Sequence, residues 1–211
     1  MSPLTSSSVF QLRIVLRGVS PLVWRRLLVP GDIALADLHR VLRTAFCWSD
    51  FYLYTFHFHG RTVGRDTGDP HAVRLADLAL HRGERFRYRY NFFADWECDV
   101  RLESILPQAA SPVLPCCVAG RNPAPEEEEG GAWYYQQLQD HHRFPPTDAL
   151  SVLAETIDSV LQRGDRAEID LEEWEPAQER VDAYLKFRER KFQRQQVNAE
   201  LRQLWLERRP A

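Results

Sequence analysis

The stretch from residue 85 to residue 101 constrains the fold most, because residue types alternate on both sides of a short turn. Before the turn, aromatic side chains alternate with arginines: Arg85, Phe86, Arg87, Tyr88, Arg89 and Tyr90. After it, carboxylates alternate with apolar residues: Asp95, Trp96, Glu97, Cys98, Asp99 and Val100. Successive side chains of a β-strand point to opposite faces. The stretch therefore predicts a hairpin with one packed aromatic face and one face of arginines and carboxylates.

The rest of the chain mixes strand and helix patterns, which predicts an α+β fold. Alternation typical of strands covers residues 9–16, 22–29 and 52–59, and helical spacing covers residues 35–46, 133–142 and 150–161. Asp32 fits the N-cap of the first helix, and residues 75–80 predict a short helix. Five prolines between residues 107 and 125 predict that no regular element forms there. We expect a compact α/β roll with a mixed or antiparallel sheet, flanking helices and a C-terminal helical extension.

The composition is that of a globular domain. The 211 residues are 44% hydrophobic and 27% charged, enough for one well-cored domain with an extension. A net charge of -3 argues against a protein coated in nucleic acid but leaves room for local basic patches. Residues 1–8 are polar and predict no signal peptide, and no apolar run reaches the ~20 residues that span a bilayer. Cys116 and Cys117 are adjacent, which predicts reduced thiols in a cytoplasmic protein.

The segment Trp24-Arg25-Arg26-Leu27 places two successive arginines on opposite faces of a strand. One of them should point toward the interior or toward a carboxylate. We predict that Trp96 is buried and that Asp95 or Glu97 contacts one of these arginines. The predicted polar cluster contains Arg25, Arg26, Asp95, Trp96, Glu97 and Asp99. Two roles stay open: the carboxylates could organise the sheet by pairing with Arg25, Arg87 or Arg89, or two of them could flank a substrate bond or share a cation.

Two further segments carry strong charge or helical character. The acidic loop, Glu126, Glu127, Glu128 and Glu129, favours a solvated loop over a cation site because like charges repel. Beyond it, residues 176–209 predict one long helix, or two with a bend near residues 193–196. Its last apolar residues are Val197, Leu201, Leu204 and Trp205, which either dock on a second subunit or an acidic partner or pack on their own domain. The expected organisation is a disordered N-terminus at 1–8, an α+β domain at 9–175 and a helical segment at 176–211.

Several motifs occur together in a recognisable order. They are Trp24-Arg25-Arg26, Val29-Pro30-Gly31-Asp32, the hairpin from Tyr90 to Cys98, the segment from Cys117 to Gly120, and the glutamate run that ends at Gly131. Over residues 9–190 this order resembles the Ri-plasmid ORF-3-like family, also labelled TnpR-like passenger proteins of insertion elements. The resemblance implies an α+β roll of unknown function that is found on plasmids, mobile elements and chromosomes. No serine-recombinase or tyrosine-recombinase signature in the sequence supports the resolvase-like label.

The chain departs from the family's pattern at positions that could hold a metal. Asn91, Phe93, Ala94 and Cys98 stand where the family has Asp, Gly, Asp and His, and Ala124 and Glu129 replace two cysteines. If family members bind metal there, the weak candidates left here are Cys98, Cys117, His141 and His142. Only Cys98, Cys117 and Glu129 remain at the family's own positions, which are too few soft ligands for a closed structural zinc site unless His141 or His142 joins them. We therefore predict no structural zinc and no cofactor.

These observations favour a non-catalytic interaction or accessory module from a plasmid or mobile-element context. Its partner would be a protein, with nucleic acid as a weaker candidate, and self-association would use the C-terminal helix. The alternative is a metal-assisted or carboxylate-based hydrolase, so whether the protein is an enzyme stays open. The sequence names no substrate, no partner and no oligomeric state.

Overall fold

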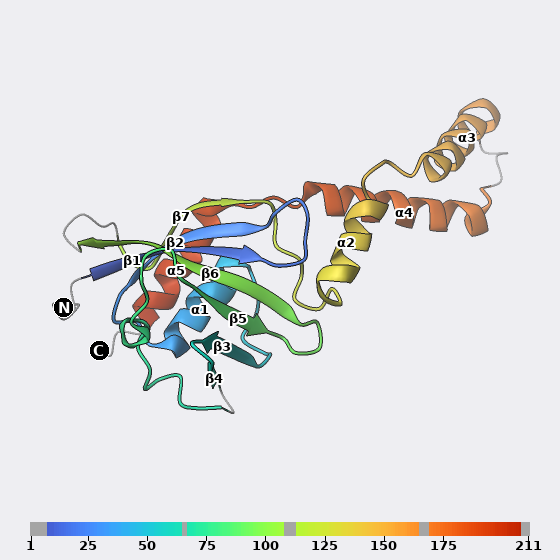
Figure 1. The fold of residues 1–211 in the computed structure, drawn as a ribbon. Helices are drawn as coiled ribbons and strands as arrows, with labels where there is room; N and C mark the ends of the chain where they lie inside the picture. Colours follow the sequence, from blue (N-terminus) through green and yellow to red (C-terminus); the bar gives the residue numbers. More distant parts are fainter. Residues whose placement is uncertain (1–7, 65–66, 108–112, 165–168, 208–211) are drawn as a thin grey trace. The chain divides into compact units, whose positions relative to one another are not determined.

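The computed structural model describes residues 8–64, 67–107, 113–164 and 169–207 (Figure 1). The chain divides into two compact units. Unit one contains the described residues up to 136 and those from 192 onward, and unit two contains residues 137–191. These limits differ from the expected organisation into 9–175 and 176–211. The expected disordered N-terminus lies outside the described residues except for Ser8, which begins the first strand.

Unit one is built on a seven-stranded antiparallel sheet with the strand order β4-β3-β5-β6-β1-β2-β7. The strands are β1 (Ser8–Leu16), β2 (Trp24–Pro30), β3 (Tyr54–Phe58), β4 (Arg61–Gly64), β5 (Arg85–Tyr90), β6 (Trp96–Pro107) and β7 (Cys116–Arg121). The predicted hairpin is confirmed as β5 and β6, which pair Tyr90 with Trp96 and Arg87 with Asp99. The fold is α+β, as the mixed sequence pattern predicts.

One face of the sheet is covered by α1 (Leu35–Ala45) and α5 (Arg194–Glu207), which lie side by side in Figure 1. The inward-facing strand positions hold large rings, and Tyr88, Tyr90 and Trp96 are each 0% exposed. The predicted burial of Trp96 is therefore confirmed. Because strand side chains alternate between faces, the opposite face carries the polar half of each strand and meets solvent.

Two local predictions are wrong. Asp32 does not cap the first helix: α1 begins at Leu35, and its N-cap Ala34 makes no side-chain hydrogen bond. Ala34 instead forms an isolated bridge with Arg74, just before the short 3-10 helix η1 (Leu75–Leu78). The proline-rich stretch is not free of regular structure, because β7 forms within it. Its prolines stand before and after the strand, where proline is tolerated, rather than inside it.

The C-terminal segment consists of two helices, α4 (Leu171–Glu189) and α5, separated at residues 190–193. Of the two alternatives for the last apolar residues, the structure has them packed on their own domain and not on a second subunit. Val197 is 2% exposed and Leu201 is 0% exposed, because α5 packs on α1 and β7 of its own chain. The apolar face of this helix, which had to be buried for the helix to persist, is therefore covered within unit one.

Unit two consists of helices. It contains the end of α2 (Gly131–His141), α3 (Thr147–Arg163) and α4. No helix in the described part of the chain is long and apolar enough to cross a membrane.

Candidate functional site

The hairpin turn and the acidic loop are held together by shared hydrogen bonds. Asn91 adopts a left-handed backbone with φ of 49°, which asparagine tolerates better than most residues. Its Nδ2 donates to the carbonyl oxygen of Glu127 over 2.8 Å, and Trp96 Nε1 donates to the same oxygen over 2.9 Å. Asn91 and Trp96 of the hairpin therefore hold the acidic loop in place through the backbone of Glu127.

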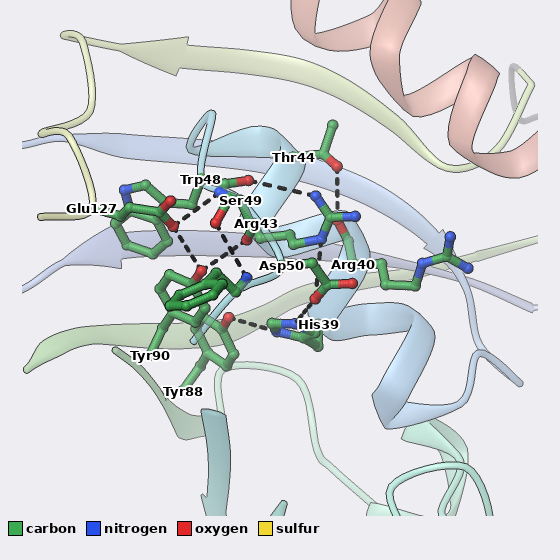
Figure 2. A network of polar contacts seen from close by, with 11 residues as sticks. His39, Arg40, Arg43, Thr44, Trp48, Ser49, Asp50, Tyr88, Tyr90 and Glu127 are labelled. Atoms are coloured by element: carbon green, nitrogen blue, oxygen red, sulfur yellow. Dashed lines mark hydrogen bonds and ion pairs between the residues drawn. The ribbon is translucent and has the colours of Figure 1, made fainter. Parts of the chain in front are cut away.

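The side chain of Glu127 extends this anchor into a network (Figure 2). One carboxylate oxygen accepts from the Tyr90 hydroxyl over 2.7 Å and from the backbone N–H of Ser49 over 2.9 Å. Burial and the neighbouring carboxylate raise the pKa of Tyr90. The solvated-loop prediction is thus wrong for Glu127, whose partners offset its partial burial, whereas Glu126 and Glu128 are exposed.

A second part of the network surrounds His39, which is 2% exposed. Its Nε2 lies 2.8 Å from Asp50 Oδ1, and its Nδ1 lies 2.8 Å from the Tyr88 hydroxyl (Figure 2). Since the Asp50 carboxylate can only accept, the neutral imidazole carries its proton on Nε2 and accepts from Tyr88. Burial lowers the pKa of His39, and the ring also stacks on Tyr54 with centroids 3.6 Å apart. With both nitrogens bonded, the imidazole is suited to holding α1 on the sheet rather than to proton transfer with a ligand.

Arg25 is the inward-facing arginine of the pair, and it is 1% exposed. Its guanidinium donates to backbone carbonyls rather than to a carboxylate: Nε to Ala45 at 2.8 Å, and Nη1 to Trp24, Arg121 and Asn122 at 2.9, 3.1 and 3.0 Å. It also stacks on Phe192, 4.0 Å from the ring centroid. Desolvation lowers the pKa of Arg25 to about 10, so the side chain stays charged at neutral pH.

The structure divides the predicted polar cluster between two faces of the sheet. Arg25 and Trp96 face inward, whereas Arg26, Glu97 and Asp99 face outward. The predicted contact of Asp95 or Glu97 with either arginine is wrong, because each group has a different partner. Arg26 pairs with Glu103 at 2.6 Å, Asp95 with Arg89, Glu97 with Arg17 and Arg87, and Asp99 with Arg17. The strand register explains the outcome, since β1 lies between β2 and β6.

These ion pairs bear on the two roles left open for the strand carboxylates. Pairing with Arg87 and Arg89 organises the outer face of the sheet, as one reading expects, although Arg25 takes no part. Each of these strand carboxylates is already bonded to an arginine, Asp95 to Arg89 and both Glu97 and Asp99 to Arg17. The arrangement therefore does not favour the hydrolase alternative.

The four weak metal candidates are divided between the two units of the chain. Cys98 and Cys117 are buried in unit one, where desolvation raises the pKa of both thiols, that of Cys117 to about 11. His141 and His142 belong to unit two, and His142 Nδ1 lies 2.8 Å from the Leu138 carbonyl oxygen. Among the residues that the structure describes, no three His, Cys, Asp or Glu side chains gather in a group that could hold a metal ion.

The outer face of the sheet carries a row of four arginines at directly opposed positions. Arg26 on β2 lies opposite Arg13 on β1, Arg13 opposite Arg101 on β6, and Arg101 opposite Arg85 on β5. We call these residues the arginine row. With neighbouring strands about 4.8 Å apart, the row extends roughly 14 Å across the sheet.

Only part of the arginine row is neutralised. Glu103 binds Arg26, while Arg101 and Arg85 have no carboxylate within ion-pair distance in the described part of the chain. Like charges at directly opposed positions destabilise a sheet. The row continues into a groove of about 620 Å³ between β3, β4, β5 and β6. The basic side chains that line it are His57, His59, Arg61, Arg85, Arg87 and Arg89.

The sheet, the buried polar contacts of His39 and Glu127, and the arginine row define a class of protein: an α+β domain with one helix-covered face and one open basic face. The family model of plasmid pRiA4b ORF-3-like proteins matches residues 8–178, and the chain belongs to this family.

Two further proteins are similar to this chain. The chain is 33% identical over 109 residues to the uncharacterized protein y4hQ of Sinorhizobium fredii, an alignment that spans 48% of this chain and 56% of that protein. A crystal structure of a protein of unknown function, MM3350 from Methanosarcina mazei Go1, is similar with a TM-score of 0.61 and 27% identity. That similarity covers 78% of this chain and 94% of the other.

Sequence reasoning misses several residues that shape these sites. Glu103, Phe192 and Asn198 each bind a distant segment, and no local pattern marks them. The alternation of β1 and β6 does signal that Arg13 and Arg101 share a face with the other arginines. Their alignment in one row depends on register, which a single sequence does not supply.

Proposed function

We propose that this protein is a non-catalytic accessory module that binds the phosphate backbone of nucleic acid through the open face of its sheet. The observation that carries the proposal is the arginine row, in which Arg85 and Arg101 lie side by side without a carboxylate partner among the described residues. Arginine is well suited to phosphate because its planar fork of donors binds phosphate oxygens in a bidentate manner.

The distribution of charge supports this role despite the net charge of -3. The carboxylates on the open face are already paired: Glu103 with Arg26, Glu97 with Arg17 and Arg87, and Asp99 with Arg17. Among the described residues they leave Arg85 and Arg101 without a carboxylate partner. On the open face, Trp24 lies under the guanidinium groups of Arg13 and Arg26 at 5.1 and 5.5 Å. The stacked ring orders these arginines and adds an aromatic surface beside the charge.

The mobile-element context remains a prediction from the family resemblance. An accessory role there is compatible with a face that contacts phosphates and reads no sequence, since phosphate contacts position a protein without specifying bases.

The test is fluorescence anisotropy with labelled 20-nucleotide single-stranded and duplex DNA over a range of salt concentrations. For the single strand, log K should fall linearly with log salt concentration, by about 0.7 per phosphate contact. A variant with Arg85→Gln and Arg101→Gln should therefore have a slope smaller by about 1.4. At 0.1 M salt it should bind roughly 10- to 30-fold more weakly.

The matched control is Arg40→Gln with Arg143→Gln, which removes the same charge from α1 and unit two. It should leave the affinity and the salt slope nearly unchanged. Equal losses in the two double variants would mean that net charge alone acts, and an absence of binding at 50 mM salt would contradict the proposal outright.

A further inference from the structure

Helices α3 and α4 of unit two form an antiparallel pair with almost no core. An exposed ion pair joins them: the guanidinium of Arg180 on α4 donates to both carboxylate oxygens of Asp148 on α3, at 2.7 and 3.0 Å. Only Ala149 on α3 and Ala177 on α4 are buried. Two small side chains remove little apolar surface from water, so the pair gains little stability from its own packing.

Both helices carry apolar residues at the spacing of a coiled-coil seam, and these residues stay half exposed. On α3 the seam is Leu150, Leu153, Ile157 and Val160, and on α4 it is Leu171, Trp174, Val181 and Leu185. Leu150 is 41% exposed, Ile157 49%, Leu171 57% and Leu185 48%. In one half of a four-helix bundle, two helices each expose part of an apolar seam with this spacing. Helices α3 and α4 have this arrangement.

The charges of α4 indicate which partner fits. The first half of the helix carries Glu172, Glu173, Glu175 and Glu179 without a basic residue. The second half carries Arg180, Lys186 and Arg188 together with Asp182 and Glu189, and Arg190 and Lys191 follow it, so this end has a net positive charge. When two copies of such a helix run antiparallel, the acidic half of each lies against the basic half of the other. The surface is therefore complementary to itself about a two-fold axis.

We propose that two copies of this protein associate through α3 and α4 into an antiparallel four-helix bundle. The seam residues of each copy fill the space between the four helices, and the flanking charges set the antiparallel orientation. This interface differs from the one expected at residues 197–205, which α5 buries within unit one. The inference is independent of nucleic-acid binding.

The first experiment measures the mass of the full chain by light scattering after size exclusion, from 1 to 100 μM. The expected mass is that of two 24.6 kDa chains. Ile157→Asp with Leu185→Asp should give a monomer with an unchanged far-UV circular dichroism spectrum. Phe93→Asp is the control, because Phe93 is 96% exposed on the hairpin turn of unit one, and its mass should equal that of the unmodified chain.

The second experiment uses charge reversal, because an apolar-to-acidic change could also disturb α3. Glu172→Lys, Glu173→Lys and Glu175→Lys together make α4 basic at both ends and should weaken the dimer by about 100-fold or more. Adding Lys186→Glu, Arg188→Glu and Lys191→Glu to the same chain should restore the dimer. A monomeric unmodified chain at 100 μM, or a triple variant that dimerises normally, would overturn the proposal. A monomer whose melting temperature falls with Ile157→Asp would show instead that the chain's own sheet covers the seam.

Discussion

Replacing Arg25 with methionine is expected to lower the free energy of unfolding by about 4 kcal/mol. The guanidinium supplies hydrogen bonds to four carbonyl oxygens. Three N–H groups make these bonds, because Nη1 has two hydrogens for three of the carbonyl oxygens. Each charged N–H contributes about 2 kcal/mol, and the stacking on Phe192 contributes about 1 kcal/mol more. Against this stands the cost of burying the charge. A pKa lowered from 12.5 to about 10 corresponds to about 3 kcal/mol. The balance leaves the side chain stabilising, because methionine fills similar space but leaves the carbonyls without donors.

Urea denaturation followed by tryptophan fluorescence measures the effect. With a slope of about 2 kcal/mol per molar urea, the midpoint should fall by about 2 M. The matched control is Arg85→Met, an exposed position on the same sheet, which should stay within about 0.5 kcal/mol of the unmodified protein. An Arg25→Met protein within 1 kcal/mol of the unmodified chain would refute the reasoning. It would mean that water or neighbouring groups satisfy the carbonyls as well as the guanidinium does.

Three further outcomes are expected. Trp96→Ala should cost about 3 to 5 kcal/mol in urea denaturation, because the ring is 0% exposed, whereas Phe93→Ala should change little. The melting temperature should fall between pH 7.5 and pH 5.5: burial lowers the pKa of His39 below 6.5, so its contribution is complete above pH 6.5 and is lost as the pH falls toward the folded-state value. His39→Gln should flatten that dependence, and an equally steep curve in the variant would assign it to other groups. Elemental analysis after dialysis should find far less than one zinc per chain, because Ala124 and Glu129 stand where the family has cysteines; a stoichiometric value would overturn this prediction.

Local alternation predicts the hairpin and the burial of Trp96 because strand geometry ties every second side chain to one face. The same parity argument predicts that one of two successive arginines faces inward, and Arg25 does. The alternation of side chains along a strand does not predict the order of the strands in the sheet. Arg26 and the carboxylates of residues 95–99 carry opposite charges, but β1 lies between their strands, and Glu103 pairs with Arg26 instead.

The anchoring role of Glu127 escapes the sequence for a different reason. A run of four glutamates favours solvation on average. One member is recruited because Tyr90, Asn91 and Trp96 offer it donors from another segment. The pair of glycines after the run permits this close approach of the loop to the hairpin. Gly131 has φ of 87°, and a Cβ there would collide with the carbonyl oxygen of Ala94 in the hairpin turn.

Because α5 belongs to unit one, the order in which the chain is synthesised matters for how that unit matures. The edge strand β7 ends at residue 121, yet Asn198, whose side-chain amide bonds both backbone groups of Cys117, comes almost 80 residues later. At 5–20 residues per second, a ribosome leaves that edge unpaired for roughly 4 to 16 s. A nascent chain that stops at residue 178, where the family match ends, should therefore stay open to proteases at β7 although its sheet is complete. Helix α5 therefore completes unit one last, after the strands that it covers have left the ribosome.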